Sequence, residues 1–250
     1  METLLTFFFF LMGLIFGSFF NVVGLRLPKN IPFANDRSIC LNCKHQLTWY
    51  ENIPLLSYAI QGAKCRHCKA SISYIYPAIE LLTGVLFAIS YVKIGFNPEL
   101  VTAILLMSML IIILVTDIKY MLIPNKVLLF FFPLLLIMRV IVPFDPWWSA
   151  AAGCLTGALV IAVIILISRG GMGGGDMKLF GVIGLVLGVK EVLLAFFLSC
   201  MIGAIIGIAL LSLKIISRKQ PVPFGPYIVV GTIITYFYGD FLIDWYFNFS

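Results

Sequence analysis

The chain has 250 residues, of which 62% are hydrophobic and 11% are charged, with a mean hydropathy of +1.08 and a net charge of +6. A soluble domain of this length needs a charged surface, so this composition excludes an ordinary globular protein and makes lipid the solvent for most of the surface. The basic residues lie in short segments between apolar runs, which indicates membrane orientation and not nucleic-acid binding.

Eight apolar segments follow one another along the chain, at residues 4–25, 74–94, 99–116, 127–143, 149–168, 177–189, 191–213 and 225–247. The first has only Glu2 ahead of it and no basic residue, so we interpret it as a retained span rather than a cleaved signal peptide. Helices are expected because every backbone polar group must be satisfied inside lipid. Segment 177–189 covers only about 20 Å as a helix. It is expected either to be a short interior helix or to be extended by residues from the ends of the neighbouring segments.

The basic residues predict the orientation. All of them except Lys93, Arg139 and Lys190 fall in the four loops on the side where the first span ends. Cytoplasmic loops carry an excess of lysine and arginine, so these loops are predicted to be cytoplasmic and both termini to lie outside. The sequence therefore predicts an all-α polytopic membrane protein with about eight transmembrane helices. Residues 1–25 form its first helix, 26–73 a small cytoplasmic domain between helices 1 and 2, and 74–250 the remaining membrane domain.

Two C-x-x-C pairs lie in the predicted cytoplasmic domain, with 21 residues between them: Cys40, Cys43, Cys65 and Cys68. Four thiolates at this spacing can close tetrahedrally around Zn²⁺, and four protein ligands leave no open position, so the metal is expected to be structural. A reducing cytoplasm argues against disulfides. A redox pair is the alternative interpretation.

Two aspartates stand at the predicted cytoplasmic ends of spans. Asp117 ends the third span, and Asp176 follows the glycine-rich stretch 170–175. Two close carboxylates share a proton, so one can activate water while the other polarises a carbonyl group, as in an aspartyl protease. Glycines let a substrate backbone approach closely. The alternative is that each aspartate caps a helix or pairs with Lys119 or Lys178.

The motifs together resemble the bacterial type IV prepilin leader peptidase and N-methyltransferase family, which belongs to the G-x-G-D membrane aspartyl proteases. Any one motif is weak, but their order along nearly the whole chain is specific. The matching motifs are Gly17-Ser18-Phe19-Phe20-Asn21, Arg26-Leu27-Pro28, the two C-x-x-C pairs, Glu51-Asn52-Ile53-Pro54, Tyr76-Pro77-Ala78-Ile79-Glu80, Asp117 with Ile123-Pro124, Gly173-Gly174-Gly175-Asp176-Met177-Lys178 and Pro223-Phe224-Gly225-Pro226-Tyr227.

The resemblance implies two activities. The enzyme is expected to remove the basic leader of type IV prepilins or pseudopilins at the cytoplasmic membrane face, and then to methylate the new amino terminus with S-adenosylmethionine. Asp117 and Asp176 take the positions of the catalytic aspartates, supported by a loop with Gly173, Gly175 and Lys178. The four cysteines take those of the zinc ligands. The methyltransferase candidates are Glu51, Asn52, Pro54 and Glu80. No glycine-rich nucleotide motif marks a site for the methyl donor.

Three other hypotheses fit parts of the sequence. One keeps the protease and drops the methyltransferase. Another is a cation- or proton-coupled transporter that uses the same two carboxylates, although both lie at one membrane face and not at the midplane. A third is a non-catalytic scaffold around a zinc knuckle, which leaves the aspartates unexplained. In each case the chain is expected in the bacterial inner (plasma) membrane, in contact with lipid.

Overall fold

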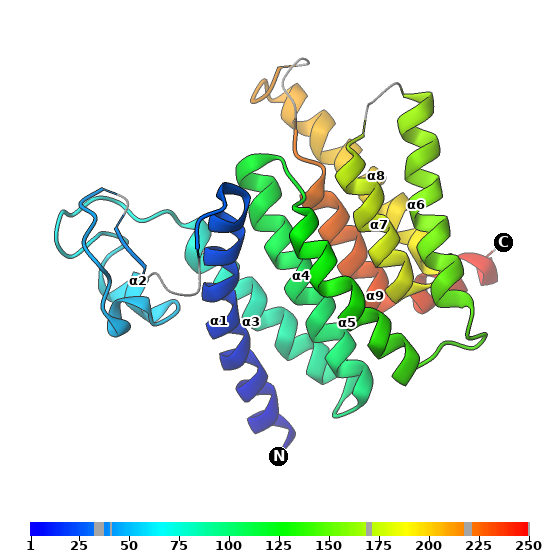
Figure 1. The fold of residues 1–250 in the computed structure, drawn as a ribbon, viewed down its shortest axis with the longest axis horizontal. Helices are drawn as coiled ribbons and strands as arrows, with labels where there is room; N and C mark the ends of the chain where they lie inside the picture. The colour runs from blue at the N-terminus through cyan, green and yellow to red at the C-terminus, as the bar shows by residue number, and fades with distance from the viewer. Residues whose placement is uncertain (33–37, 41, 169–171, 218–221, 250) are drawn as a thin grey trace. The chain divides into compact units, whose positions relative to one another are not determined.

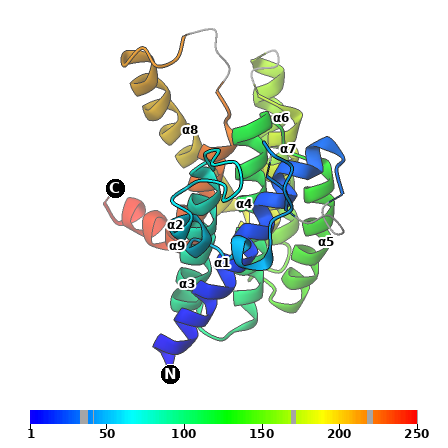
Figure 2. The ribbon, with the colours of Figure 1, turned by 90° about the vertical axis from the view of Figure 1, so that its left-hand side faces the viewer.

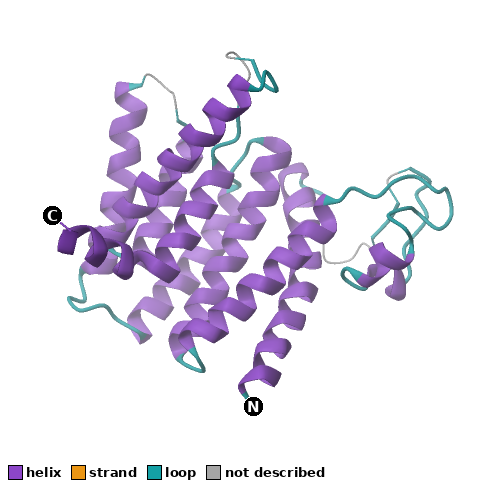
Figure 3. Ribbon diagram, turned by 180° about the vertical axis from the view of Figure 1, so that it is seen from behind, coloured by secondary structure: helices purple, strands orange, loops and turns teal. Residues whose placement is uncertain are grey.

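The computed structural model describes all residues except 33–37, 41, 169–171, 218–221 and 250. Helices form most of the described backbone, and two isolated bridges are its only β pairing; Figure 3 shows helices joined by loops. The α-helices are α1 Glu2–Arg26, α2 Leu56–Ile60, α3 Ile75–Ile94, α4 Pro98–Tyr120, α5 Asn125–Ile141, α6 Ser149–Ile167, α7 Gly174–Leu187, α8 Val189–Ser212 and α9 Gly225–Phe249 (Figure 1). Two short 3₁₀ helices, η1 Leu27–Lys29 and η2 Trp49–Asn52, complete them.

Each of the eight apolar segments coincides with one long helix. Six of these helices, α1, α3, α4, α6, α8 and α9, are long and apolar enough to cross a membrane. Helices α5 and α7 are shorter, with 17 and 14 residues. The prediction of an all-helical, polytopic membrane protein is therefore confirmed, and the count of eight crossings stays a prediction.

The chain divides into two compact units, Met1–Val115 and Thr116–Ser250. The division falls inside α4, so that Asp117 at the end of this helix belongs to the second unit. The predicted boundaries at residues 25 and 73 lie within the first unit and stay predictions.

Close packing of α1 against α3 holds the first unit together. A Cβ atom added at Gly13 would lie 2.7 Å from the backbone of Gly84, and one at Gly17 would lie 2.8 Å from the Cα atom of Glu80. Gly13 and Gly17 are four residues apart and therefore share one helix face, which lets the two backbones touch. Toward the other end, the rings of Phe9 and Tyr91 stack at 4.9 Å.

Helix α7 is the centre of the second unit. It contacts α5, α6, α8 and α9, and all its residues from Leu179 to Leu187 are buried. Its closest neighbour is α6, which runs beside it in Figures 1 and 2. Segment 177–189 is thus a short interior helix, the first of the two options that its length left open.

Glycines on both helices set the α6–α7 distance. A Cβ atom at Gly184 would overlap the carbonyl oxygen of Gly153, and one at Gly157 would overlap the carbonyl oxygen of Phe180. Both neighbours are backbone atoms, which cannot move aside as a side-chain tip can. The helices must therefore separate if either glycine gains a side chain.

We predict that Gly184→Ala lowers the thermal unfolding midpoint of the purified protein in detergent, because overpacking a tight interface costs about 1–3 kcal/mol. Gly181→Ala is the matched control on the same helix, since its added Cβ atom would meet its nearest neighbour at an ordinary 3.6 Å. Equal midpoints for the two variants would contradict this account of the interface.

Candidate active site and metal centre

Asp117 and Asp176 line one cavity of about 930 Å³ in the second unit. Its walls come from the end of α4 and the loop after it, the start of α7, the middle of α8 and the start of α9. The charged residues on these walls are the two aspartates and Lys178. The structure thus brings together two carboxylates that lie 59 positions apart in the sequence.

The carboxylate of Asp117 is fixed by a backbone donor. The side chain lies in the last turn of α4 and is 6% exposed. Its Oδ2 atom accepts a hydrogen bond of 2.7 Å from the N–H of Gly225, the first residue of α9. A Cβ atom at Gly225 would lie 2.5 Å from this oxygen, so the contact requires glycine. The free N–H groups and the dipole at a helix start also favour a negative charge there.

Asp176 is both a helix cap and a cavity residue. It is the third residue of α7, and its Oδ2 atom accepts the N–H of Gly173 at 3.0 Å, while its own N–H donates to the carbonyl oxygen of Gly173 at 3.0 Å. The capping interpretation is therefore correct, yet the same side chain lines the cavity. Gly175 is needed beside it because an added Cβ atom would lie 3.1 Å from the Cβ atom of Ile123.

Neither of the two lysines considered as partners for these aspartates forms an ion pair with them. Lys178 donates from Nζ to the Oδ1 atom of Asn125 at 3.0 Å. Among the described residues, neither aspartate forms an ion pair with Lys119 or Lys178. The contribution of Gly225 was not predicted, although the Pro-Phe-Gly-Pro sequence before the last helix marked its position.

The four cysteines of the first unit form a site that can hold a metal ion. Their sulfur atoms all lie within 4.8 Å of one another. The Sγ atoms of Cys40 and Cys68 are 3.7 Å apart, and those of Cys43 and Cys65 are 4.0 Å apart. A tetrahedral zinc ion with Zn–S bonds of about 2.3 Å sets its sulfurs about 3.8 Å apart. The spacing of the thiols therefore fits such an ion.

The two halves of this site repeat the same backbone turn. In each half the N–H of the first cysteine donates across the turn at 2.9 Å, from Cys40 to His45 and from Cys65 to Ala70. Lys44 and Lys69, the residues after the second cysteines, both have a φ angle of 59°. Each half is thus a knuckle, and the second repeats the first 25 positions later.

The surroundings of two of the four thiols, Cys40 and Cys68, favour negative sulfur atoms. The backbone N–H of Ala70 and the side chain of Asn42 lower the pKa of Cys68 to about 6. The backbone N–H groups of Cys43 and Asn42 also lower the pKa of Cys40. For Cys43, the N–H of His45 favours the thiolate, but burial and the neighbouring thiols outweigh it and raise its pKa to about 11. Four thiolates so close together need a cation between them.

The methyltransferase candidates separate into two places. Glu51 is buried and accepts the N–H and the hydroxyl group of Thr48 at 2.9 and 2.8 Å, and these two bonds lower its pKa. It also lies 4.0 Å from the imidazole of His45. Asn52 ends η2 and is exposed. Glu51 and Asn52 thus belong to the cysteine-bearing part of the first unit.

Glu80 and Pro54 meet at a strained turn. The Oε2 atom of Glu80, in α3, accepts the N–H of Leu55 at 2.9 Å, and the hydroxyl group of Ser18 is its second polar neighbour. Leu55 has φ and ψ angles of 59° and −48°, and the N–H of Leu56 donates back to Pro54 at 2.6 Å. This is a γ-turn with positive φ, which is rare for a residue with a side chain. A buried carboxylate therefore holds the turn against α3.

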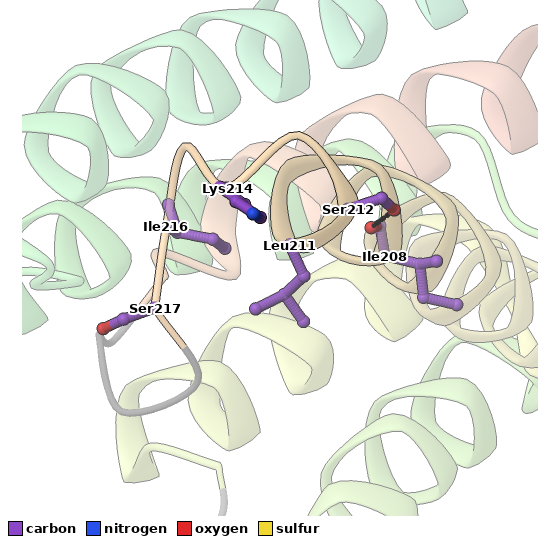
Figure 4. A pocket seen from close by; sticks show the side chains of 6 residues that line it. All are labelled: Ile208, Leu211, Ser212, Lys214, Ile216 and Ser217. Atoms are coloured by element: carbon purple, nitrogen blue, oxygen red, sulfur yellow. Dashed lines mark hydrogen bonds between the residues drawn. The ribbon is translucent and has the colours of Figure 1, made fainter.

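A second pocket, of about 450 Å³, lies at the end of α8 and is shown in Figure 4. Ile208, Leu211 and Ile216 line it, and Lys214 is its one charged lining residue. The Ser212 hydroxyl donates to the carbonyl oxygen of Ile208. This pocket brings no pair of groups together that could carry out acid–base chemistry.

Comparison with known proteins gives two family matches that together cover most of the chain. Residues 11–94 match the Bacterial Peptidase A24 N-terminal domain, and residues 104–208 match the Type IV leader peptidase family. No solved structure matches the chain.

Full-length relatives give the same result. A prepilin leader peptidase/N-methyltransferase of Bacillus subtilis is 46% identical over 237 residues, which cover 95% of this chain and 96% of the relative. Proteins of the same name from Aeromonas salmonicida and Pseudomonas aeruginosa are 34% and 32% identical, over 95% and 96% of this chain and 92% of each relative.

We predict that Glu80→Leu speeds amide hydrogen exchange at residues 55–57. An unsatisfied buried donor costs about 1–3 kcal/mol, which corresponds to a rise of roughly fivefold to 150-fold in the exchange rate. Glu80→Gln keeps an acceptor oxygen and is the control that should exchange almost as the parent does. Unchanged exchange in Glu80→Leu would show that another group holds the turn.

Proposed function

Because this chain belongs to the type IV prepilin leader peptidase family, we propose that it is a membrane aspartyl endopeptidase and N-methyltransferase. It removes the leader of type IV prepilins or pseudopilins and methylates the amino terminus that the cut creates. The single observation that carries the peptidase half is the presence of Asp117 and Asp176 on the walls of one cavity.

The chemistry of the cut follows from the pairing of the carboxylates. Two close carboxyl groups share a proton and titrate as a pair, so one is ionised while the other is neutral. The ionised group takes a proton from water, which attacks the scissile carbonyl carbon, and the neutral group donates a proton to the carbonyl oxygen. Collapse of the tetrahedral species breaks the C–N bond as the amine leaves with a proton. The mostly apolar walls limit the number of competing water molecules.

The distribution of basic residues supports a cytoplasmic catalytic face with both termini outside. Lys119 lies two residues after Asp117 in α4, and Lys178 lies two residues after Asp176 in α7, so basic residues adjoin both aspartates in the sequence. A substrate with a basic leader followed by an apolar helix presents its junction at the same interface. Its cut site therefore reaches the depth of Asp117 and Asp176.

We predict that Asp117→Asn and Asp176→Asn each reduce leader removal by about 10²-fold to 10⁴-fold, because each variant removes one acid–base group. The measurement is the size shift of a prepilin-like substrate that is co-expressed with each variant. Glu191→Gln is the control, since Glu191 is a half-buried carboxylate of the same unit that does not line the cavity. A substrate that is trimmed normally by either asparagine variant would refute the dyad.

For the metal site, we propose structural Zn²⁺ bound by Cys40, Cys43, Cys65 and Cys68. The support is the spacing of the sulfur atoms and the N–H groups that favour thiolates. The ion neutralises the clustered negative charge and ties the two knuckles together. A segment of under 50 residues has too small a core to fold alone, so the metal supplies the missing stability.

We predict that the double variant Cys40→Ser/Cys43→Ser loses its zinc and exchanges amide hydrogens faster across residues 38–73. Elemental analysis of the purified protein and hydrogen exchange measure the two effects. Cys154→Ser is the control, because Cys154 lies in α6 and outside the cluster. Metal-free protein with the exchange rates of the parent would show that the ion has no structural role.

The methyltransferase half rests on the relatives and on the carboxylates of the first unit. S-adenosylmethionine would supply the methyl group. After the new amine loses a proton, which a nearby carboxylate can accept, its nitrogen would bond to the methyl carbon as the S–CH₃ bond breaks and S-adenosylhomocysteine leaves. Glu51, Asn52, Pro54 and Glu80 are the candidate residues around this reaction. Mass spectrometry of the processed substrate tests the proposal, and a fully cleaved product with an unmodified amine would leave only the peptidase.

A further inference from the structure

One wall of the carboxylate cavity is made of small residues on α8. Cys200, Gly203, Ala204 and Gly207 all line the cavity, at the spacing of one helix face. Other faces of α8 expose large apolar side chains, among them Phe197, Ile205 and Ile208. The part of α8 that lines the cavity with the two aspartates therefore carries only small side chains.

The space in front of this wall is open. A Cβ atom at Gly207 would meet no atom within 4 Å, and one at Gly203 would meet only the ring edges of Tyr227 at 3.1 Å and Phe224 at 3.4 Å. No backbone atom presses on either glycine, in contrast to Gly153 and Gly184. The rings of Tyr227 and Phe224 therefore account for the glycine at position 203, whereas no contact within the described protein accounts for the one at position 207.

The volume of the cavity is comparable to that of a short helical segment. A helix about 10 Å across fills roughly 80 Å³ for each ångström of its length, so the cavity has room for about two turns. Helices in lipid approach one another through faces with small residues spaced four apart, as Gly203 and Gly207 are. Met121, Leu122 and Val222 complete an apolar lining around the same space.

We propose that this face of α8 binds the first turns of the substrate's apolar helix, and that the open space at Gly207 determines which helices fit. The inference rests on the proposed function. The bond to be cut must lie at Asp117 and Asp176, and the apolar helix follows it directly in the substrate, so it must occupy the uncharged part of the same cavity. The basic leader is excluded from this wall, which offers it no acceptor charge.

The test compares Gly207→Leu with Ala209→Leu in steady-state cleavage of a full-length prepilin-like substrate. Leucine at 207 fills the space that the substrate helix needs, so KM is expected to rise about tenfold or more while kcat changes little. Ala209 is exposed on α8 and does not line the cavity, so the control keeps the parental KM. An unchanged KM for Gly207→Leu, or a loss confined to kcat, would overturn the proposal.

A second measurement covers the case in which Gly207→Leu fails to fold. Gly207→Cys and Ala209→Cys are each placed in a Cys200→Ala, Asp176→Asn background and oxidised with a substrate that carries one cysteine in the first two turns of its apolar segment. A disulfide to the substrate is expected at position 207 and not at 209. Three outcomes would each overturn the proposal. They are equal disulfide yields at positions 207 and 209, a disulfide between two enzyme chains, and no disulfide to the substrate because lipid fills the cavity.

Failure of this inference is distinguishable from failure of the proposed function. If the asparagine variants of the two aspartates still cleave, the dyad is wrong, whatever Gly207→Leu does. If they are inactive while Gly207→Leu keeps its KM and shows no specific disulfide at position 207, the dyad stands and only the binding wall is wrong.

Discussion

The length and burial of α7 decide where the candidate active site lies. Its 14 residues span about 21 Å, which is short of the roughly 30 Å of a hydrocarbon core. Contacts with α5, α6, α8 and α9 surround it, and glycine-to-backbone contact with α6 fixes it along its axis. At its far end, the buried side chain of Arg139 donates to the carbonyl oxygen of Val186 at 2.6 Å and lies over the ring of Phe144. Asp176 at the start of a short, fixed helix therefore has little freedom to move relative to Asp117.

Burial of the carboxylates depends on backbone groups more than on side chains. Asp117 receives its hydrogen bond from the N–H of Gly225, and Asp176 from the N–H of Gly173. A lysine or arginine in their place would neutralise the charge and hold each aspartate permanently ionised, which would prevent the pair from sharing a proton. Backbone donors satisfy the oxygen atoms and leave the protonation state free to change. The glycines that the sequence places around both aspartates serve this arrangement, because a side chain at Gly225 would collide with the carboxylate.

Local patterns predicted the elements well and long-range contacts poorly. The apolar segments predicted the long helices because helix formation depends on near neighbours in the chain. The paired C-x-x-C motifs predicted the clustered thiols because this spacing is typical of metal ligands, although Cys40 and Cys68 lie 28 positions apart. The hydrogen bond between Asp117 and Gly225 joins residues 108 positions apart. The hydrogen bond between Glu80 and Leu55 holds a residue with a positive φ angle, and leucine is not a residue type from which such an angle is predicted. Contacts of this kind depend on how the helices pack against one another. Helix packing leaves no periodic pattern in a single sequence from which these contacts could be predicted. The role of the glycines of α8 could not be predicted either, since glycine in a membrane helix is compatible with tight helix packing and with an open cavity wall.

The division of the chain separates the two proposed reactions. Both aspartates belong to the unit that begins at Thr116, while the cysteine cluster and Glu80 belong to the unit that ends at Val115. The two family matches divide the chain at nearly the same place, since the first covers residues 11–94 and the second covers residues 104–208. The cut must come first, because the amine to be methylated does not exist before the C–N bond breaks. In the proposed function, cleavage uses carboxylates of the second unit, and the candidate residues for methylation belong to the first unit. A variant that loses methylation can therefore keep cleavage, whereas a variant that loses cleavage leaves no new amine to methylate unless an already cut substrate is supplied.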